Sequence, residues 1–305
     1  MELRKNGGLG WSGEFSMTRF IYLSDTHLGS SGSGFHQQKT YPERLSEIVA
    51  VLNAWIRQDG RIDFVLHGGD MTDSGTRDLI WQASHLFKLP VPVRLCLGNH
   101  DLTERESLAH WLKLCPDFFS GGRPEYLIET EDCVLHVVPN NWMEIPYRWV
   151  DTQNPHFLDD QITLLDRQSA RRAVRPQILL THSPVFGLPP EQTGMAKPFH
   201  EPVATFTKTV VEWAKRQPGL LCVLGGHTHM NMRVEHAKVN YVTVSALVEV
   251  PFEFKVFEIG TDSWSMKTIS LADQLHFRSE YNHEKHYVQG SEKERTVEVH
   301  SLRKR

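Results

Sequence analysis

The chain has 305 residues, of which 40% are hydrophobic and 23% are charged, and its formal net charge at pH 7 is −4. This composition predicts a folded chain with a substantial core, because disordered chains contain fewer apolar residues. The acidic balance argues against a general nucleic-acid binder, which needs a basic surface, so a nucleic-acid polymer is not an expected partner. No run of about 18 apolar residues occurs, so neither a spanning helix nor a membrane partner is expected.

The N-terminal segment and the cysteines indicate the cellular compartment. Residues 1–17 are expected to form a loose extension, and they contain no continuous apolar stretch of the kind found in signal peptides. The four cysteines are far apart along the chain, which predicts buried reduced thiols in a cytoplasmic protein. We expect one main domain over residues 18–271, followed by a charged C-terminal extension over residues 272–305.

The first part of the chain alternates short apolar runs with amphipathic segments. In chain order, the pattern predicts a strand at 18–24, a helix at 42–57, a strand at 62–66, a helix at 76–87, a strand at 91–97 and a helix at 103–114. This alternation is typical of parallel strands joined by crossover helices.

The second part begins with a predicted hairpin and ends with predicted antiparallel strands. The elements are strands at 126–129 and 133–138, a helix at 158–173, a strand at 177–180, a helix at 203–216 and a strand at 220–224. Strands at 239–244, 252–259 and 264–269 are expected to form a closing antiparallel meander. The segment 247–255 is interpreted as a core strand with a proline kink and no chemistry. Residues 283–305 are expected to be a solvated tail or an edge strand, and the alternative is a tail that covers the active site or an oligomer interface.

Polar motifs follow five of the predicted strands. They are Asp25-Thr26-His27, Gly69-Asp70, Gly98-Asn99-His100-Asp101, Thr181-His182 and Gly226-His227-Thr228-His229. Ligand sites in open α/β sheets gather at the carboxyl ends of strands, so these motifs are expected to meet in one place. Carboxylate oxygens and imidazole nitrogens together suit divalent metals such as Zn, Mn, Fe or Ni.

In this order, the five motifs resemble the calcineurin-like metallophosphoesterase superfamily over about residues 20–271. In a chain of this length they are most similar to the small bacterial group of class III cyclic-nucleotide phosphodiesterases and glycerophosphodiesterases. The resemblance implies an α/β fold, a four-layer αββα sandwich with two mixed β-sheets, and makes residues 18–271 a catalytic domain.

The resemblance also implies a dinuclear centre of two divalent or trivalent transition-metal ions, such as Mn, Fe or Zn. A hydroxide bridging these ions would attack phosphorus in line. The expected ligands of the first ion are Asp25, His27, Asp70 and His229. The expected ligands of the second ion are Asp70, Asn99, His182 and His227.

Two further residues have catalytic roles by the same resemblance. His100 is expected to contact the phosphate and assist the leaving oxygen, and Asp101 to hold the imidazole of His100 by a hydrogen bond. The alternative for Asp101 is a turn or helix-cap residue.

The expected activity is hydrolysis of a small phosphodiester, either a cyclic nucleotide or a glycerol-type diester. The alternatives are a phosphomonoesterase or pyrophosphohydrolase with the same centre, a non-catalytic scaffold on this fold, and a DNA-repair type nuclease, which the acidic balance disfavours. A homo-oligomer is possible on the sequence. Relatives often have a second His in the fourth motif, where this chain has Thr181 and Ser183.

Weaker candidates surround the motifs. His36 and His200 lie in Gly-rich or Pro-rich stretches and could face the substrate, although surface positions are the alternative. His67 is expected to pack at a strand end and Asp73 to support a turn or a ligand. The loop at 140–149 either lines the substrate pocket or lies on the surface.

Overall fold

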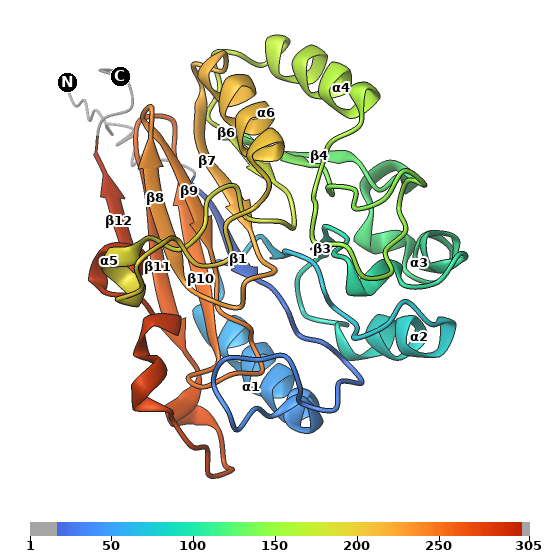
Figure 1. Cartoon of the computed structure of the whole chain (residues 1–305), viewed down its shortest axis with the longest axis vertical. Helices are drawn as coiled ribbons and strands as arrows, with labels where there is room; N and C mark the ends of the chain where they lie inside the picture. Colours follow the sequence, from blue (N-terminus) through green and yellow to red (C-terminus); the bar gives the residue numbers. More distant parts are fainter. Residues whose placement is uncertain (1–16, 301–305) are drawn as a thin grey trace, which may run out of the picture.

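The computed structural model describes residues 17–300, so the predicted N-terminal extension lies, apart from Met17, outside the described residues. Two six-stranded mixed sheets face each other between helices (Figure 1). Helices α4 and α6 lie at the top of Figure 1, and α1 and α2 lie below. The predicted four-layer αββα sandwich is therefore confirmed.

The first sheet has the strand order β12-β11-β10-β1-β2-β3. Strand β1 pairs in parallel with β2 and antiparallel with β10, so a parallel half and an antiparallel half meet at β1. The strands are β1 (Thr18–Leu23), β2 (Phe64–His67), β3 (Val93–Leu95), β10 (Glu253–Ile259), β11 (Trp264–Ser270) and β12 (Thr296–Val299).

The second sheet has the order β4-β5-β6-β7-β9-β8. Its four central strands are parallel, and an antiparallel strand closes each edge. The strands are β4 (Tyr126–Glu129), β5 (Val134–Val137), β6 (Gln177–Leu180), β7 (Leu220–Gly225), β8 (Met232–His236) and β9 (Val239–Thr243).

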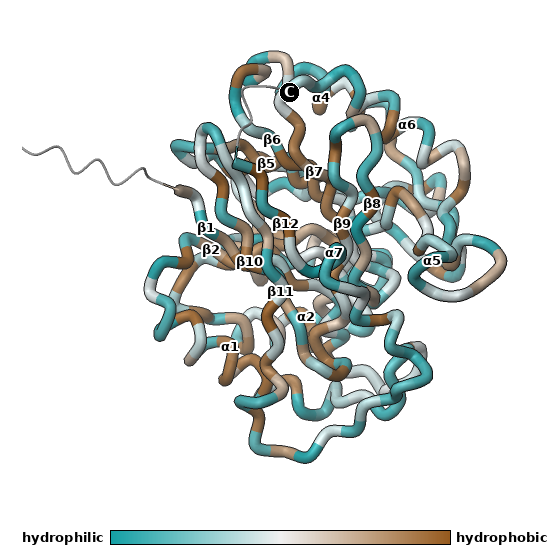
Figure 2. Tube along the Cα trace, turned by 90° about the vertical axis from the view of Figure 1, so that its left-hand side faces the viewer, coloured by the Kyte–Doolittle hydropathy of each residue, from teal (hydrophilic) through white to brown (hydrophobic). Residues whose placement is uncertain are grey.

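Alternation along the buried strands fills two separate cores. Ile178 and Leu180 of β6 face the inter-sheet core, whereas Leu179 between them belongs to the cluster under α4 and α6. Successive strand residues point to opposite faces, so a strand covered on both sides must be apolar throughout. Figure 2 shows the resulting hydrophobic colour along the central strands.

Amphipathic helices cover the outer faces of both sheets. On α1, buried Leu45, Ile48 and Leu52 follow helical spacing, and Gly60 ends the helix with a left-handed φ of 69°. The α-helices are α1 (Leu45–Asp59), α2 (Arg77–Leu86), α3 (Ser107–Leu114), α4 (Asp159–Ala170), α5 (Pro190–Thr193), α6 (Ala204–Lys215) and α7 (Glu292–Arg295). The 3₁₀ turns are Pro42–Arg44, His100–Leu102, Pro116–Phe118, Ser120–Gly122, Ala272–Gln274 and His283–Val288.

The predicted closing meander is wrong in part. Strands β10 and β11 do pair antiparallel, but β9 lies in the other sheet, where it is parallel to β7 and antiparallel to β8. Strand β8 was not predicted, because its outer half is polar and partly exposed. Residues 247–252 also form no strand, contrary to the prediction for 247–255. Neighbouring strands in the sequence can therefore belong to different sheets.

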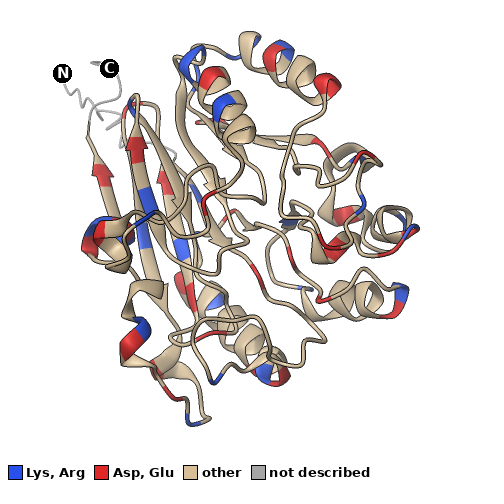
Figure 3. Ribbon diagram, in the orientation of Figure 1, with Lys and Arg blue, Asp and Glu red and all other residues tan. Residues whose placement is uncertain are grey.

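The C-terminal extension is docked onto the domain. Strand β12 pairs antiparallel with β11 at the edge of the first sheet, as one of the predicted alternatives had it. Arg295 forms an ion pair with the fully buried Glu253 at 2.5 Å. Figure 3 shows that Lys and Arg residues are interspersed with Asp and Glu residues along the outer helices. Within the described residues, no helix has the length and apolar character that a membrane span requires.

Candidate metal centre

Five strand ends bring the predicted motifs together at one edge of the sandwich. Asp25 and His27 follow β1, Asp70 follows β2, and Asn99 follows β3 in the first sheet. His182 follows β6, and His227 and His229 follow β7 in the second sheet. The carboxyl ends of parallel strands point the same way in each sheet, so the ligand-bearing loops meet across the sandwich.

One group of ligand atoms consists of Asp25, His27 and His229. One atom from each lies within 4.8 Å of the others. The Nε2 atoms of His27 and His229 are 3.1 Å apart, and the Nε2 atom of His229 is 3.6 Å from Oδ1 of Asp25. This group corresponds to three of the four ligands expected for the first ion.

A second group consists of Asp70, His182, His227 and Asn99. Nε2 of His182 is 3.2 Å from Oδ2 of Asp70 and 3.2 Å from Oδ1 of Asn99. Oδ1 of Asn99 is also 3.0 Å from Nδ1 of His227. Oδ2 of Asp70 lies 3.7 Å from Nε2 of His27 in the first group. Asp70 therefore touches both groups, as expected of a bridging ligand.

The backbone at the ligands is held in an uncommon conformation. Asp25, His27, Asp70, His227 and His229 have left-handed φ values of 56°, 42°, 51°, 66° and 55°. Such conformations cost about 1–3 kcal/mol each for residues other than glycine and concentrate at functional sites. The rest of the fold must offset that cost. A purely structural role would not require residues in this conformation.

Glycines beside the ligands leave room that no side chain could share. A Cβ atom at Gly98 would lie 2.2 Å from Oδ1 of Asp70, and one at Gly69 would lie 2.4 Å from Nδ1 of His182. A Cβ atom at Gly226 would lie 2.8 Å from Oδ2 of Asp25. The glycines of these motifs therefore permit the close approach of the ligand side chains.

The hydrogen bonds of the imidazoles show that electron-rich atoms face each other. Nδ1 of His27 donates to Oδ1 of Asp73 (3.2 Å), and Nδ1 of His182 donates to the carbonyl oxygen of Gly68 (2.9 Å). Nε2 of His227 donates to Oε1 of Gln153 (2.9 Å). These bonds leave a lone pair on the inward nitrogen of each ring. Inward lone pairs beside carboxylate oxygens fit a bound cation, so the donor set suits the metals implied by the resemblance.

The electrostatics of the protein without ions indicate the same need for positive charge. Burial opposes ionisation, yet the neighbouring Asp70 carboxylate raises the pKa of His182 to about 9. The surrounding imidazoles lower the pKa of Asp70 well below its usual value against the effect of burial. Both shifts indicate that this group of ligand atoms favours a positive charge in its midst, which suits a bound cation.

His100 lies at the rim of this centre, but the expected bond from Asp101 is absent. The backbone N–H of His100 donates to Oδ1 of Asp70 (2.8 Å), and its Nδ1 donates to the carbonyl oxygen of Asp73 (2.9 Å). The carboxylate of Asp101 instead accepts from the backbone N–H of Gly98 (3.0 Å) and from Thr72. Asp101 thus braces the turns that carry Asn99 and Asp70, close to its alternative role as a turn residue.

A cleft of about 370 Å³ opens over the metal centre. Trp149 is one wall, with its ring 5.0 Å from that of His100. His200 lines the cleft, as considered from the sequence, whereas His36 lies behind it and faces the carbonyl oxygen of Thr228 at 3.0 Å. Gln153 and Glu201 also line the cleft and were not predicted.

The structure also places the other weaker candidates. His67 is fully buried, and its ring nitrogens face Thr26 and the backbone N–H of Gly69, as expected of a packing residue. Oδ1 of Asn140 accepts from Ser183 and Thr181, so this part of the 140–149 loop supports the fourth motif.

Glu249 is the main functional candidate that sequence reasoning missed. Its side chain is fully buried, and Oε1 lies 3.4 Å from Nδ1 of His229. Burial raises the pKa of Glu249 to about 7, although backbone N–H groups of Gln37 and His36 oppose the rise. An acidic residue inside an otherwise apolar run was the available signal, since buried carboxylates need partners.

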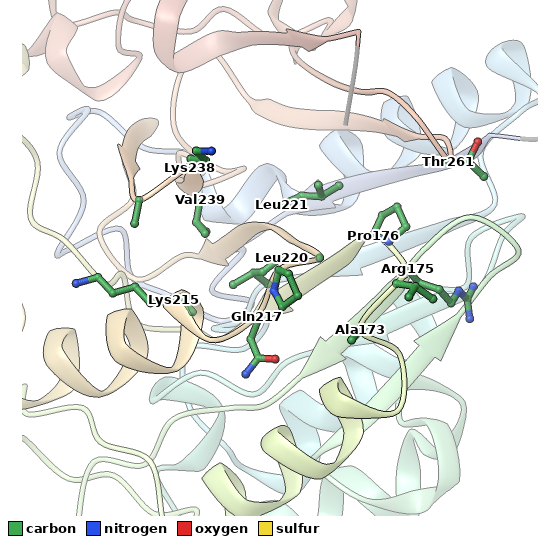
Figure 4. A pocket seen from close by; sticks show the side chains of 15 residues that line it. Ala173, Arg175, Pro176, Lys215, Gln217, Leu220, Leu221, Lys238, Val239 and Thr261 are labelled. Carbon is green, nitrogen blue, oxygen red and sulfur yellow. The ribbon is translucent and has the colours of Figure 1, made fainter. Parts of the chain in front are cut away.

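A second hollow lies at the opposite ends of β6 and β7. Its volume is about 380 Å³, and Figure 4 shows aliphatic and basic side chains around it. It is lined by segments 173–176, 214–215, 217–221 and 237–239 and by Thr261, and it contains no member of the five motifs.

Comparisons with known proteins agree with the fold. A dimetal phosphatase from Danio rerio is similar, with a TM-score of 0.63 and 16% identity over 83% of this chain and 96% of that one. The anchor protein GAP50 of the Plasmodium inner membrane complex has a TM-score of 0.57 and 11% identity, over 87% of this chain and 89% of that one. A purple acid phosphatase from yellow lupin seeds has a TM-score of 0.58 and 11% identity, over 86% of this chain and 52% of that one. No curated protein matches the sequence.

The sequence itself matches a family model over the part that carries all five motifs. The model of the calcineurin-like phosphoesterases covers residues 18–231, more than half of the chain. Together with the two groups of ligand atoms, this match makes the protein a metal-dependent phosphoesterase. The chain belongs to the calcineurin-like phosphoesterase family.

Proposed function

We propose that the protein hydrolyses a small phosphodiester, of the cyclic-nucleotide or glycerol type. The observation that carries this choice is the charge of the cleft. Among the described residues that line it, none is Lys or Arg, and Glu201 adds a negative charge. A phosphomonoester carries about −1.5 to −2 charge at pH 7, whereas a diester carries one negative charge. A cleft without basic side chains favours the less charged substrate.

The bound ions and the side chains of the site would have different chemical roles. Two bound ions would be held by the seven motif ligands and would supply activation of water and neutralisation of charge on the phosphoryl oxygens. The remaining tasks belong to the chain. Nδ1 of His100 donates to the carbonyl of Asp73, so Nε2 is the nitrogen left for the leaving oxygen. The imidazolium form, protonated on both nitrogens, would deliver the Nε2 proton and leave the ring neutral with its proton on Nδ1.

Trp149 favours a substrate that carries a planar group. Its backbone N–H donates to the carbonyl of Leu102 (3.0 Å), and its indole Nε1 donates to the carbonyl of Thr152 (2.8 Å). Because two bonds fix the ring at the cleft wall, a nucleobase could stack on it without a large loss of side-chain entropy. This favours cyclic nucleotides over glycerol diesters within the proposed class.

The test compares matched diester and monoester substrates on the metal-loaded protein. We expect kcat/KM for bis(p-nitrophenyl) phosphate to exceed that for p-nitrophenyl phosphate by at least about tenfold, because the cleft discriminates by charge. A preference for the monoester would reject the diester proposal and favour the phosphomonoesterase alternative. Trp149→Ala should raise KM for cyclic AMP and leave KM for glycerophosphocholine unchanged if the planar group is recognised.

The same fold also serves as an anchor, as the name of the Plasmodium neighbour states. The complete ligand set and its strained backbone favour catalysis here. Isolation of the protein without bound transition metal, and no activity after addition of Mn²⁺, Fe²⁺ or Zn²⁺, would favour a scaffold instead.

We further propose a cytoplasmic location. All four cysteines are buried and none forms a disulfide, as expected in a reducing compartment. The possible homo-oligomer stays a prediction.

A further inference from the structure

His229 presents an unsatisfied atom on the side away from the metal centre. Its Nε2 atom faces His27 and Asp25, whereas its buried Nδ1 atom has no hydrogen-bond partner among the described residues. The nearest carboxylate oxygen that faces Nδ1 is Oε1 of Glu249, at 3.4 Å. An imidazole that ligates a metal through one nitrogen usually donates the proton of the other to an acceptor of this kind.

Glu249 is itself held by the loop that follows the first motif. Its Oε2 atom accepts from the backbone N–H of Gln37 (2.7 Å), and its Oε1 atom accepts from that of His36 (3.3 Å). These two hydrogen bonds restrain the orientation of the carboxylate, which rotation about the side-chain bonds would otherwise leave variable.

The same loop is tied to the C-terminal extension through one fully buried side chain. Oε1 of Gln37 accepts from the backbone N–H of Asn282 (2.8 Å), and its Nε2 atom donates to the carbonyls of Asn282 (3.2 Å) and Lys285 (3.1 Å). The contacts therefore run without a break from the extension through Gln37 and Glu249 to His229.

We propose that Glu249 is a positioning residue for the metal ion that Asp25, His27, Asp70 and His229 hold, and that Gln37 couples this position to the C-terminal extension. Glu249 keeps the proton of His229 on Nδ1, which leaves Nε2 free to ligate. The imidazoles expected to ligate the second ion have other acceptors, because Nδ1 of His182 donates to the carbonyl of Gly68 and Nε2 of His227 donates to Oε1 of Gln153, so Glu249 supports the first ion alone.

The inference concerns metal occupancy and does not depend on whether the substrate is a diester. The full-length protein is stripped with a chelator and titrated with Co²⁺, with the absorption of the Co²⁺ d–d bands and the bound-metal content as readouts. Glu249→Gln removes the charge at nearly constant shape. Loss of such a partner costs about 10–100-fold in metal affinity, so one of the two Co²⁺ ions should bind about 10–100-fold more weakly. The affinity for the other should stay within about twofold.

Gln37→Ala tests the coupling to the extension. It removes the three bonds to Asn282 and Lys285 but leaves the Glu249 carboxylate in place. The affinity for the same Co²⁺ ion should fall, and it should fall by less than in Glu249→Gln. The matched control is Tyr281→Phe, which removes a bond to Gln289 within the extension and none to Gln37 or Glu249. Its two Co²⁺ affinities should equal those of the wild type.

Equal Co²⁺ affinities in Glu249→Gln and wild type would overturn the positioning role. An equal loss of affinity for both Co²⁺ ions would also overturn it, because that result indicates a general loosening of the protein structure around the site. If Glu249→Gln fails to fold by circular dichroism, Gln37→Ala decides by the same criterion. A protein that binds two ions normally yet prefers monoesters would reject only the proposed substrate class.

Discussion

Two hollows on different parts of the molecule have almost the same size but differ in what faces them. The cleft over the metal centre measures about 370 Å³, and the hollow at the opposite ends of β6 and β7 measures about 380 Å³. Buried imidazoles and a carboxylate converge at the first, whereas aliphatic side chains and the stems of basic residues line the second (Figure 4). Volume therefore does not distinguish a site, but convergence of buried ligand atoms does.

Left-handed backbone conformations occur at both hollows but have different causes. Ala237 and Lys238 at the second hollow also have left-handed φ values, of 50° and 67°, but they form the turn between β8 and β9. Two-residue hairpin turns commonly require positive φ. The left-handed residues of the metal centre follow strands whose next element is not a hairpin partner, so chain reversal does not explain them. Strain is informative where no turn demands it.

The largest expected effect comes from Asp70→Asn. This carboxylate lies close to both ligand groups, so its loss should weaken the binding of both metal ions. We expect kcat/KM to fall by about 10⁴-fold, corresponding to the several kcal/mol that metal ions contribute. Steady-state kinetics and metal content measure the effect. If His36→Ala costs more activity than Asp70→Asn, the bridging assignment is wrong.

His100→Ala should have the next largest effect, confined to turnover. The ring contacts the cleft but is bonded through Nδ1 only to the carbonyl of Asp73. We expect kcat to fall by about 10²–10³-fold, as for removal of a general acid, with metal content unchanged. Loss of metal in this variant would instead place His100 among the ligands, where its proximity to His27 and Asp73 makes it eligible.

A buried lysine away from both hollows should influence stability alone. Lys255 is fully buried and donates to Thr268 and to the carbonyl of Glu294. Burial lowers its pKa to about 7, partly opposed by Glu253. The unfolded chain, with an ordinary lysine pKa, binds more protons above pH 7, so stability should rise with pH from about 7 to 10 by up to about 1.4 kcal/mol per unit.

Lys255→Met provides the matched comparison. Urea unfolding of both proteins in chelator should show the difference in stability growing in favour of the wild type between pH 7 and 10. A constant difference across that range would show that Lys255 keeps its proton in the folded protein.

The smallest effect is expected at the second hollow. Gln217→Ala removes a bond to Ser169 and enlarges this hollow without touching the motifs. Activity and metal content should stay within about twofold of the wild type, since distant surface substitutions seldom matter. A larger loss of activity, with the fold intact, would show that this hollow takes part in function. Convergence of buried ligand atoms would then not be enough to identify the functional hollow.

The sequence by itself determined the five strand-end motifs and the layered α/β class. Apolar runs followed by Asp, Asn and His specify both a buried strand and a polar end, and these are local properties of consecutive residues. All seven predicted ligands come together for the same reason, since parallel strands in each sheet end at the same edge.

Only the tertiary structure decided which groups support those ligands. Glu249 approaches His229 from an irregular segment that was predicted as a strand without chemistry, and Asp101 turns to Gly98 and Thr72 rather than to His100. The assignment of β9 to the second sheet likewise depended on pairing with β7 rather than with its neighbour β10. Such contacts join residues whose separation in the chain carries no periodic signal. They follow from how the packed layers orient each side chain.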